Sequence, residues 1–221
     1  MNMYLATVTC NRDFQQLLLQ AESIQKFLQP CKHVIIINEI EPDLDFYHKW
    51  LDRFYTNHEL ILRPRIPYNY PVEGFRKIIS NESSAIGWRN QQLQKLLLAY
   101  EYEEDYLLLD SKNFFIKPTS LSYYMHPDFY GSGIVKLLGY NYEGRKDNYN
   151  ANYKIYQKLL NIETLPEHIT TINTPYKIHR DLLVNRMPRE SLGNYLFAPN
   201  FYDSVPSEFT FYALLIADHA D

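Results

Sequence analysis

The chain has 221 residues, of which 46% are hydrophobic and 22% are charged, and its formal net charge is −4. This length and apolar content predict one packed domain over residues 1–221 and exclude a largely disordered chain. The negative net charge disfavours a general nucleic-acid binder, which carries a basic surface. It leaves room for a local basic site that binds a phosphorylated ligand.

The N-terminal sequence MNMYLATVTCNRD is too short and too polar to be a signal peptide. No apolar run approaches the roughly 18–20 residues that cross a bilayer. The two cysteines, Cys10 and Cys31, lie in no metal-binding or CxxC spacing, and we expect both to be reduced thiols. These features predict a cytoplasmic protein without a transmembrane segment.

The first forty residues predict a β-α-β unit. Tyr4–Cys10 has the small and β-branched residues of a strand. Phe14–Leu28 places apolar residues on one helical stripe, and Asn11 or Asp13 is the candidate N-cap. His33–Ile40, with the sequence HVIIINEI, is the continuous apolar run of a strand covered on both faces.

The rest of the chain continues this alternation. We expect a helix, a strand, a helix and two strands at 43–55, 59–64, 87–102, 105–110 and 113–118. Arg63–Ile86 contains three prolines and no clear period, and we predict an irregular segment that borders the site. Further on we expect a helix over 150–160, then a short strand, a proline turn and a helix over 170–187. The last predicted element is a helix over 205–221, with Ser207 as its N-cap.

This order of elements predicts an α/β fold with a mostly parallel central sheet flanked by helices. In such sheets, ligands bind outside the carboxyl ends of the strands, close to the point where the strand order reverses. Polar clusters follow three of the predicted strands, at Thr9–Asp13, Asn38–Glu39 and Asp110–Asn113. We expect these clusters to converge on one site. Taken alone, Asp110–Asn113 is also typical of a surface turn, because Asp and Asn side chains bond nearby backbone amides.

Several common site motifs are missing from the sequence. It contains no GxGxxG, no GxxxxGK[ST], no GxSxG and no HExxH, which disfavours Rossmann, P-loop, α/β-hydrolase and zinc-protease chemistry. The predicted helix before the fourth strand carries Arg89, Gln92 and Lys95 at a spacing of three residues, so their side chains project together. They are either donors to ribose and phosphate oxygens or part of a solvated helix face.

Four segments in order resemble glycosyltransferases of the GT-A fold. YLLLDSKNFFIKP resembles the strand and turn that carry the DxD motif, and GWRNQQLQKL resembles the preceding helix of a bacterial and viral group of GT-A-like proteins. TPYKIHRDLL and PSEFTFYALL are similar to downstream segments of the same group. The resemblance covers roughly residues 3 to 216, and it implies a single GT-A-like domain.

The resemblance implies a protein that binds a nucleoside-diphosphate sugar and moves the sugar to an acceptor, which the sequence does not identify. Asp110 takes the place of the first Asp of DxD, and Lys112 stands where the second Asp ligates Mn²⁺ or Mg²⁺. One arrangement keeps the cation, held by Asp110 with Asp218 or His219. Another lets Lys112 neutralise the diphosphate without a metal. A third retains the fold and loses catalysis.

Two function classes follow. In the first, a glycosyltransferase, Asp110 anchors ribose or metal and Glu208 is the catalytic base of an inverting reaction; the alternative for Glu208 is a charge at a helix start. The residues expected to bind the donor are Thr9, Asn11, Glu39, Arg89, Gln92, Lys95, Ser111, Lys112 and Asn113. The second class is a non-catalytic nucleotide-sugar-binding or assembly protein on the same fold.

Overall fold

The computed structural model describes residues 3–69, 83–124, 134–136, 156–163, 168–170, 174–196 and 208–217. Most of the irregular segment predicted over Arg63–Ile86 lies outside these residues, as does part of the helix predicted over 150–160. Within the described part of the chain, no helix has the length and apolarity that a membrane crossing requires.

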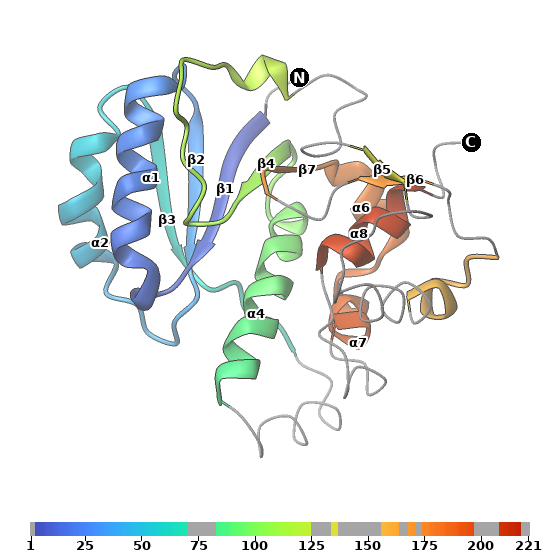
Figure 1. Ribbon diagram of the computed structural model, residues 1–221. Helices are drawn as coiled ribbons and strands as arrows, with labels where there is room; N and C mark the ends of the chain where they lie inside the picture. Colours follow the sequence, from blue (N-terminus) through green and yellow to red (C-terminus); the bar gives the residue numbers. More distant parts are fainter. Residues whose placement is uncertain are drawn as a thin grey trace, which may run out of the picture.

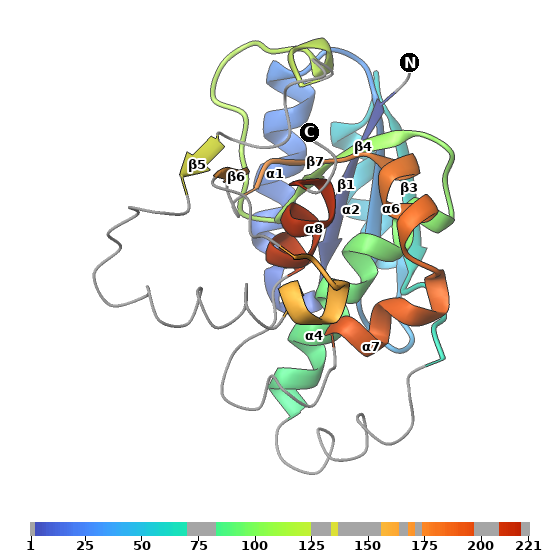
Figure 2. The ribbon, with the colours of Figure 1, turned by 90° about the vertical axis from the view of Figure 1, so that its right-hand side faces the viewer.

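A five-stranded sheet forms the centre of the molecule (Figure 1). Its strands, in the order β3-β2-β1-β4-β7, are Glu59–Pro64, Lys32–Ile37, Met3–Thr9, Asp105–Leu109 and Tyr176–Ile178. The first four are parallel, and β7 pairs antiparallel with β4. The predicted α/β class with a mostly parallel sheet is therefore confirmed. The short strands β5 (Ile134–Lys136) and β6 (His168–Thr170) form a separate antiparallel pair (Figure 2).

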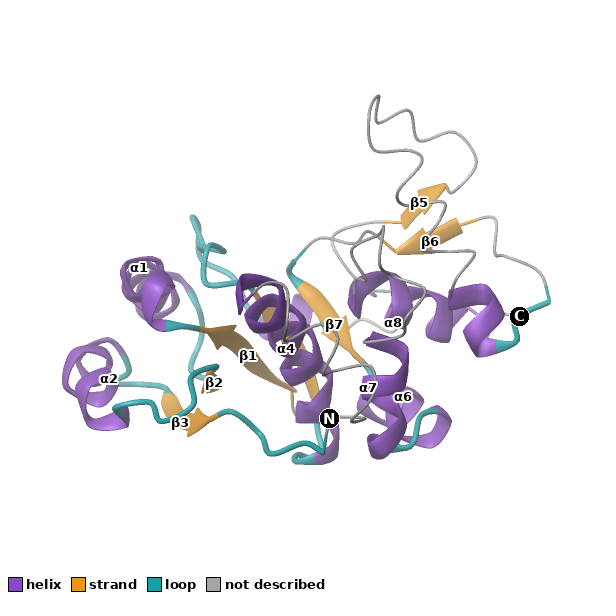
Figure 3. Ribbon diagram, turned by 90° about the horizontal axis from the view of Figure 1, so that it is seen from below, coloured by secondary structure: helices purple, strands orange, loops and turns teal. Residues whose placement is uncertain are grey.

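Helices cover both faces of the sheet (Figure 3). One face is covered by α1 (Phe14–Phe27) and α2 (Leu44–Leu51), and the other by α4 (Ser83–Leu97). Beside α4 pack α7 (Leu192–Leu196) and α8 (Glu208–Ala217), and α6 (Arg180–Arg186) packs against α8 and β4.

The pleat of β1 divides its apolar side chains between two cores. Tyr4, Ala6 and Val8 belong to the core under α4, whereas Met3 and Leu5 belong to the core under α1 and α2. Successive side chains of a strand point to opposite faces, so a strand buried on both faces is apolar throughout. This is why the continuous apolar runs, rather than alternating ones, marked the central strands in the sequence.

The strand predicted over 113–118 is wrong. This stretch has no strand, because the place beside β4 is taken by β7. After β4 the chain instead climbs alongside α1, as the yellow-green segment of Figure 1 shows, and reaches it through the bridge between Thr119 and Leu28. Phe115 of this stretch packs against the layer that contains α1, and 113–118 pairs with no strand of the sheet that the structure describes.

Candidate functional site

The strand order reverses between β1 and β4. The chain runs from β1 through α1 to β2 and β3 on one side, and it then crosses through α4 to β4 on the other side. Such a reversal leaves an opening at the carboxyl ends of the two strands that flank it, and ligands of α/β sheets bind there. Thr9 ends β1 and Asp110 directly follows β4, so both lie at this edge.

The loops after β1 and β2 are joined by hydrogen bonds. The Asn38 amide donates to the Thr9 carbonyl at 2.7 Å, and the Asn11 amide donates to Glu39 Oε1 at 3.0 Å. The Thr9 side chain is buried, and its Oγ1 has no hydrogen-bond partner among the described residues. Two of the three predicted polar clusters thus meet at one edge of the sheet.

The loops after β1 and β2 form a corner, and Tyr47 of α2 holds Asn11 within it. The sequence did not predict this role of Tyr47. Its hydroxyl donates to Asn11 Oδ1 at 2.7 Å. Burial, with the negative charge of Glu39 as a second cause, raises the pKa of Tyr47 to about 12, so the phenol stays a donor at neutral pH. Its ring packs edge-on against Phe14 and Phe46. The aromatic residues of α2 therefore fix the orientation of the Asn11 side chain.

The first turns of α4 approach the same edge. Helical side chains tilt towards the N-terminus of their helix, which for α4 is the carboxyl edge of the sheet. Asn90 Nδ2 donates to Asn38 Oδ1 at 2.6 Å, and Asn38 Nδ2 donates to the Gly87 carbonyl at 3.1 Å. Gln91 Nε2 donates to the Val8 carbonyl at 2.9 Å. These contacts hold the start of α4 against β1 and the loop after β2.

Gln92 and Lys95 do not form the solvated helix face that was one alternative for them. Both side chains are buried, with exposures of 4% and 3%, while Arg89 is half-buried. Lys95 Nζ lies 2.9 Å from Asp110 Oδ1, and Thr174 Oγ1 donates to Asp110 Oδ2 at 3.3 Å. A buried ammonium beside a carboxylate that is 42% exposed leaves the acid as the solvent-facing member of the pair.

The turn Asp110–Asn113 closes on itself through its backbone and the Asn113 side chain. Asn113 Oδ1 accepts from the Asp110 amide at 2.7 Å, and the Asn113 amide donates to the Asp110 carbonyl at 2.9 Å. Ser111 is buried and Lys112 is exposed. The turn is therefore closed by Asn113 and the backbone of Asp110. The Asp110 carboxylate bonds instead to Lys95 of α4 and to Thr174, and it is not needed to close the turn.

The described residues do not fit a DxD-type cation site. Such a site uses two carboxylates at the strand end, and here the second position is the exposed Lys112, while Asp110 pairs with a buried ammonium. Within the described part of the chain, no group of three or more His, Cys, Asp or Glu side chains is placed to hold a metal ion. Asp218 and His219, the other candidate ligands, lie outside the described residues.

Glu208 begins α8, as the sequence predicted for the terminal helix. Its side chain, and Ser207 before it, lie outside the described part of the structure. The role of Glu208 as catalytic base stays a prediction.

The structure also adds buried polar residues of α1 that the sequence analysis missed. Gln20 and Ser23 lie within the buried stripe of the helix and bond to the segment after β4. The signal was present, since Leu17, Ala21 and Ile24 surround them at helical spacing. A polar residue inside a buried apolar stripe needs a partner, and that need was the available clue.

Comparison with known proteins supports a fold assignment. Neither a protein-family model nor a curated protein matches the sequence. The solved structure of mouse xyloside xylosyltransferase 1 matches with a TM-score of 0.53 and 9% identity, over 99% of this chain and 83% of that one. The mannosyltransferase Ktr4p from S. cerevisiae matches with a TM-score of 0.60 and 13% identity, over 98% of this chain and 65% of the yeast chain.

This chain has a GT-A-like glycosyltransferase fold. At these identities the likeness concerns the fold, and function has to be argued from the site itself. The GT-A-like sheet places Asp110, Asn11 and Glu39 along its carboxyl edge, which is the edge at which α/β folds bind ligands.

Proposed function

We propose that this protein, as one domain over residues 1–221, is a glycosyltransferase that moves a sugar from a nucleoside-diphosphate sugar to an acceptor hydroxyl. The observation that carries the proposal is the carboxylate of Asp110. It directly follows β4 at the reversal of strand order, its turn closes without it, and a buried lysine holds it in place. The GT-A-like fold of the chain supports the same conclusion.

The corner formed by the loops after β1 and β2 is proposed to bind the nucleoside. Glu39 is an acceptor for ribose or base N–H and O–H groups, and Asn11 is held by Tyr47 and by its own backbone bond to Glu39. Thr9 contributes a buried hydroxyl whose hydrogen bonding is not met by the described residues. A buried polar atom without a partner costs free energy unless a ligand or water satisfies it.

The diphosphate and sugar are proposed to lie nearer β4 and α4. Arg89 and Lys95 supply positive charge, Gln92 supplies an amide, and Asp110 accepts hydrogen bonds from ribose or sugar hydroxyls. The turn residues Ser111, Lys112 and Asn113 complete the donor site. Lys112 is exposed, so its ammonium is not desolvated in the free protein, and it can neutralise phosphate oxygens without a metal.

In the proposed reaction, the bond between the anomeric carbon and the diphosphate oxygen breaks, and the nucleoside diphosphate leaves with the electron pair. The acceptor oxygen forms the new bond to the same carbon. Its proton passes to a base, and we assign that role to Glu208 for an inverting reaction.

A panel of nucleoside-diphosphate sugars tests the proposal. The melting temperature of the protein is measured with each compound, and hydrolysis or transfer is followed by release of the nucleoside diphosphate. Stabilisation with turnover supports the glycosyltransferase. Stabilisation without turnover, even with added sugar acceptors, favours the second candidate function, a non-catalytic binding protein. Lys112, which stands in place of the second acid of DxD, is the observation that favours this candidate. No stabilisation by any compound at millimolar concentration contradicts both.

A further inference from the structure

The segment that carries Asp110 is fastened to α1 by two buried polar side chains. Gln20 Nε2 donates to the Asp110 carbonyl at 2.7 Å and to the Asn113 carbonyl at 3.1 Å. Ser23 Oγ accepts from the Phe115 amide at 3.1 Å and donates to the Gln20 carbonyl at 2.7 Å. Both residues are buried, so these bonds form away from competing water.

The orientation of the Gln20 amide is fixed by a chain of hydrogen bonds from the opposite direction. Thr7 Oγ1 donates to Gln20 Oε1 at 3.0 Å. Because that bond uses the only hydroxyl proton of Thr7, the contact of 2.9 Å between Thr7 Oγ1 and His33 Nε2 requires the imidazole to donate. His33 Nδ1 is then an acceptor, and the Tyr55 hydroxyl donates to it at 2.7 Å.

Every polar side-chain atom in this chain of hydrogen bonds is therefore assigned as either a donor or an acceptor, without conflict. Protons point in a single direction, from Tyr55 through His33 and Thr7 to Gln20 and the turn after β4. Burial, with the nearby His58 as a lesser cause, lowers the pKa of His33 to about 3, and burial raises the pKa of Tyr55. The imidazole stays neutral and the phenol stays protonated at neutral pH, which preserves the direction of the chain.

We infer that Gln20 is a positioning residue, which holds the turn Asp110–Asn113 so that the Asp110 carboxylate faces the ligand, and that the buried chain Tyr55–His33–Thr7 keeps the Gln20 amide in the required orientation. That a ligand binds at Asp110 rests on the proposed function. That Gln20 fastens the turn is independent of the proposed function.

The first test is amide hydrogen exchange in Gln20→Met, which keeps the length of the side chain and removes its hydrogen bonds. The Asp110 and Asn113 amides close the turn, and we expect both to exchange on the order of tenfold faster in this variant. The Leu107 amide, inside β4, serves as the internal reference and should keep its rate. Gln15→Met, on an exposed position of the same helix, is the matched control. Turn amides that exchange at the wild-type rate in Gln20→Met overturn the inference.

A second variant separates positioning from general packing. Thr7→Val keeps the shape of Thr7 and removes the hydroxyl that orients Gln20. On its own it should raise the exchange of the turn amides less than Gln20→Met does, because Gln20 keeps its two donors. Combined with Gln20→Met it should add nothing to that exchange, since the chain is already broken at its last link. Additive effects on the turn amides would show that each residue only contributes stability, and they would overturn the orienting chain.

The third measurement joins the turn to the ligand. UDP or GDP, whichever raises the wild-type melting temperature, should bind Gln20→Met on the order of tenfold more weakly, while Gln15→Met binds as the wild type does. Undiminished affinity in a variant whose turn amides exchange faster overturns the positioning of Asp110 for the ligand. Failure of every nucleoside-diphosphate sugar of the panel to stabilise the wild type contradicts the proposed function, and the exchange of the turn amides then decides the fastening alone.

Discussion

At the scale of single residues, Asp110 is held by its neighbours rather than by its own turn. Replacing it by Asn keeps an oxygen that accepts from Lys95 and removes the negative charge beside a buried ammonium. We expect Asp110→Asn to lower the free energy of unfolding by about 1–2 kcal/mol and the donor affinity on the order of 10- to 100-fold. Urea unfolding and nucleotide titration measure the two effects, with Asp181→Asn, a mostly exposed carboxylate on α6, as the control. A large loss of stability with affinity intact would make Asp110 a structural residue.

Lys112 tests the metal requirement at the same turn. An ammonium about 4 Å from a diphosphate oxygen gains on the order of 1–4 kcal/mol, depending on how much solvent screens it, and the same ammonium repels a dication. We therefore expect donor binding to persist in EDTA, and Lys112→Asp to bind more weakly in EDTA and to recover with Mn²⁺. Lys117→Asp, an exposed lysine of the same segment, is the control for net charge. Strict Mn²⁺ dependence of the wild type would contradict this prediction.

At the scale of elements, the sequence predicted what depends on local pattern and missed what depends on partners far along the chain. The strands β1 to β4 and the helices α1 and α2 were expected because their apolar periods report burial directly. Whether 113–118 pairs with β4 is decided by β7, more than fifty residues away, and no local pattern carries that information. The place of Gln20 inside the apolar stripe of α1 was a local signal of its burial, but its partners follow β4 and no local pattern identifies them. The polar clusters were found because strand ends can be located from the strands themselves.

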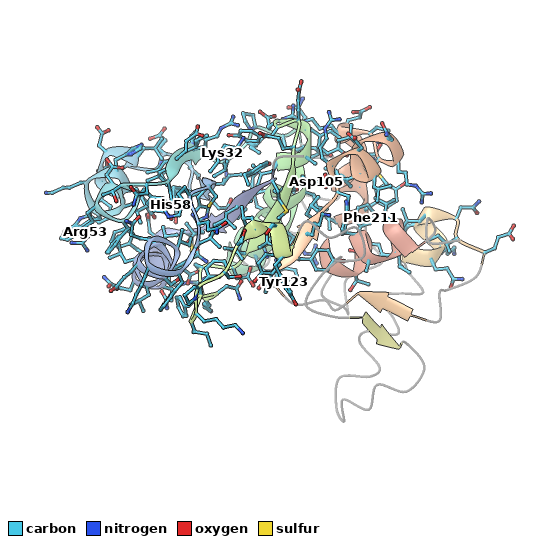
Figure 4. The ribbon with its side chains drawn as sticks, turned by 90° about the horizontal axis from the view of Figure 1, so that it is seen from above. Lys32, Arg53, His58, Asp105, Tyr123 and Phe211 are labelled. Atoms are coloured by element: carbon cyan, nitrogen blue, oxygen red, sulfur yellow. The ribbon has the colours of Figure 1, made fainter. Side chains whose placement is uncertain are left out.

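Asp105 joins three elements at the opposite end of β4 (Figure 4). It accepts the Arg180 amide at the start of α6 at 3.0 Å, and it lies 3.2 Å from His179 Nδ1 and 4.0 Å from Lys177 Nζ, next to or within β7. Burial alone would raise the pKa of Asp105, but the hydrogen bonds and charges of these partners outweigh it and lower the pKa.

We expect Asp105→Asn to destabilise the protein by about 3 kcal/mol, because it removes the carboxylate charge that lies beside the buried Lys177 and accepts from the Arg180 amide. The companion variant Lys177→Met removes the ammonium charge, so the double variant should be less destabilised than the sum of the two single variants. Urea unfolding of all four proteins measures the coupling. A loss below about 1 kcal/mol in Asp105→Asn, or strict additivity, would show that the partners do not act as a unit.

At the scale of the whole molecule, the two faces of the sheet differ in which polar groups they bury. The core under α4, which includes α6, α7 and α8, is accompanied by the buried side chains of Gln92 and Lys95. The core under α1 and α2 contains the hydrogen-bonded chain Gln20–Thr7–His33–Tyr55, with a histidine at its centre. A neutral, fully buried histidine makes the folding of the entire chain sensitive to acid.

His33 sets the direction and the window of this acid sensitivity. Its pKa of about 3 in the folded state lies below the value of 6.5 for an ordinary histidine, so between these values the unfolded chain binds more protons than the folded one. The free energy of unfolding must then fall as the pH falls from about 6.5, with a limiting slope near 1.4 kcal/mol per pH unit. The lowered pKa of Asp105 acts in the same direction but only below its ordinary value of 3.8, so it overlaps only the acid end of the His33 window.

Urea unfolding of the wild type, His33→Gln and Tyr55→Phe between pH 4.5 and pH 7.5 tests this expectation. His33→Gln removes the titrating group, so its stability should vary less with pH than that of the wild type, even if its stability at pH 7.5 is lower. Tyr55→Phe removes the hydrogen bond to Nδ1 and keeps the imidazole buried, so it should lose stability while keeping the slope. A wild-type slope that survives in His33→Gln would assign the acid sensitivity to other groups, among them His58, whose pKa burial also lowers.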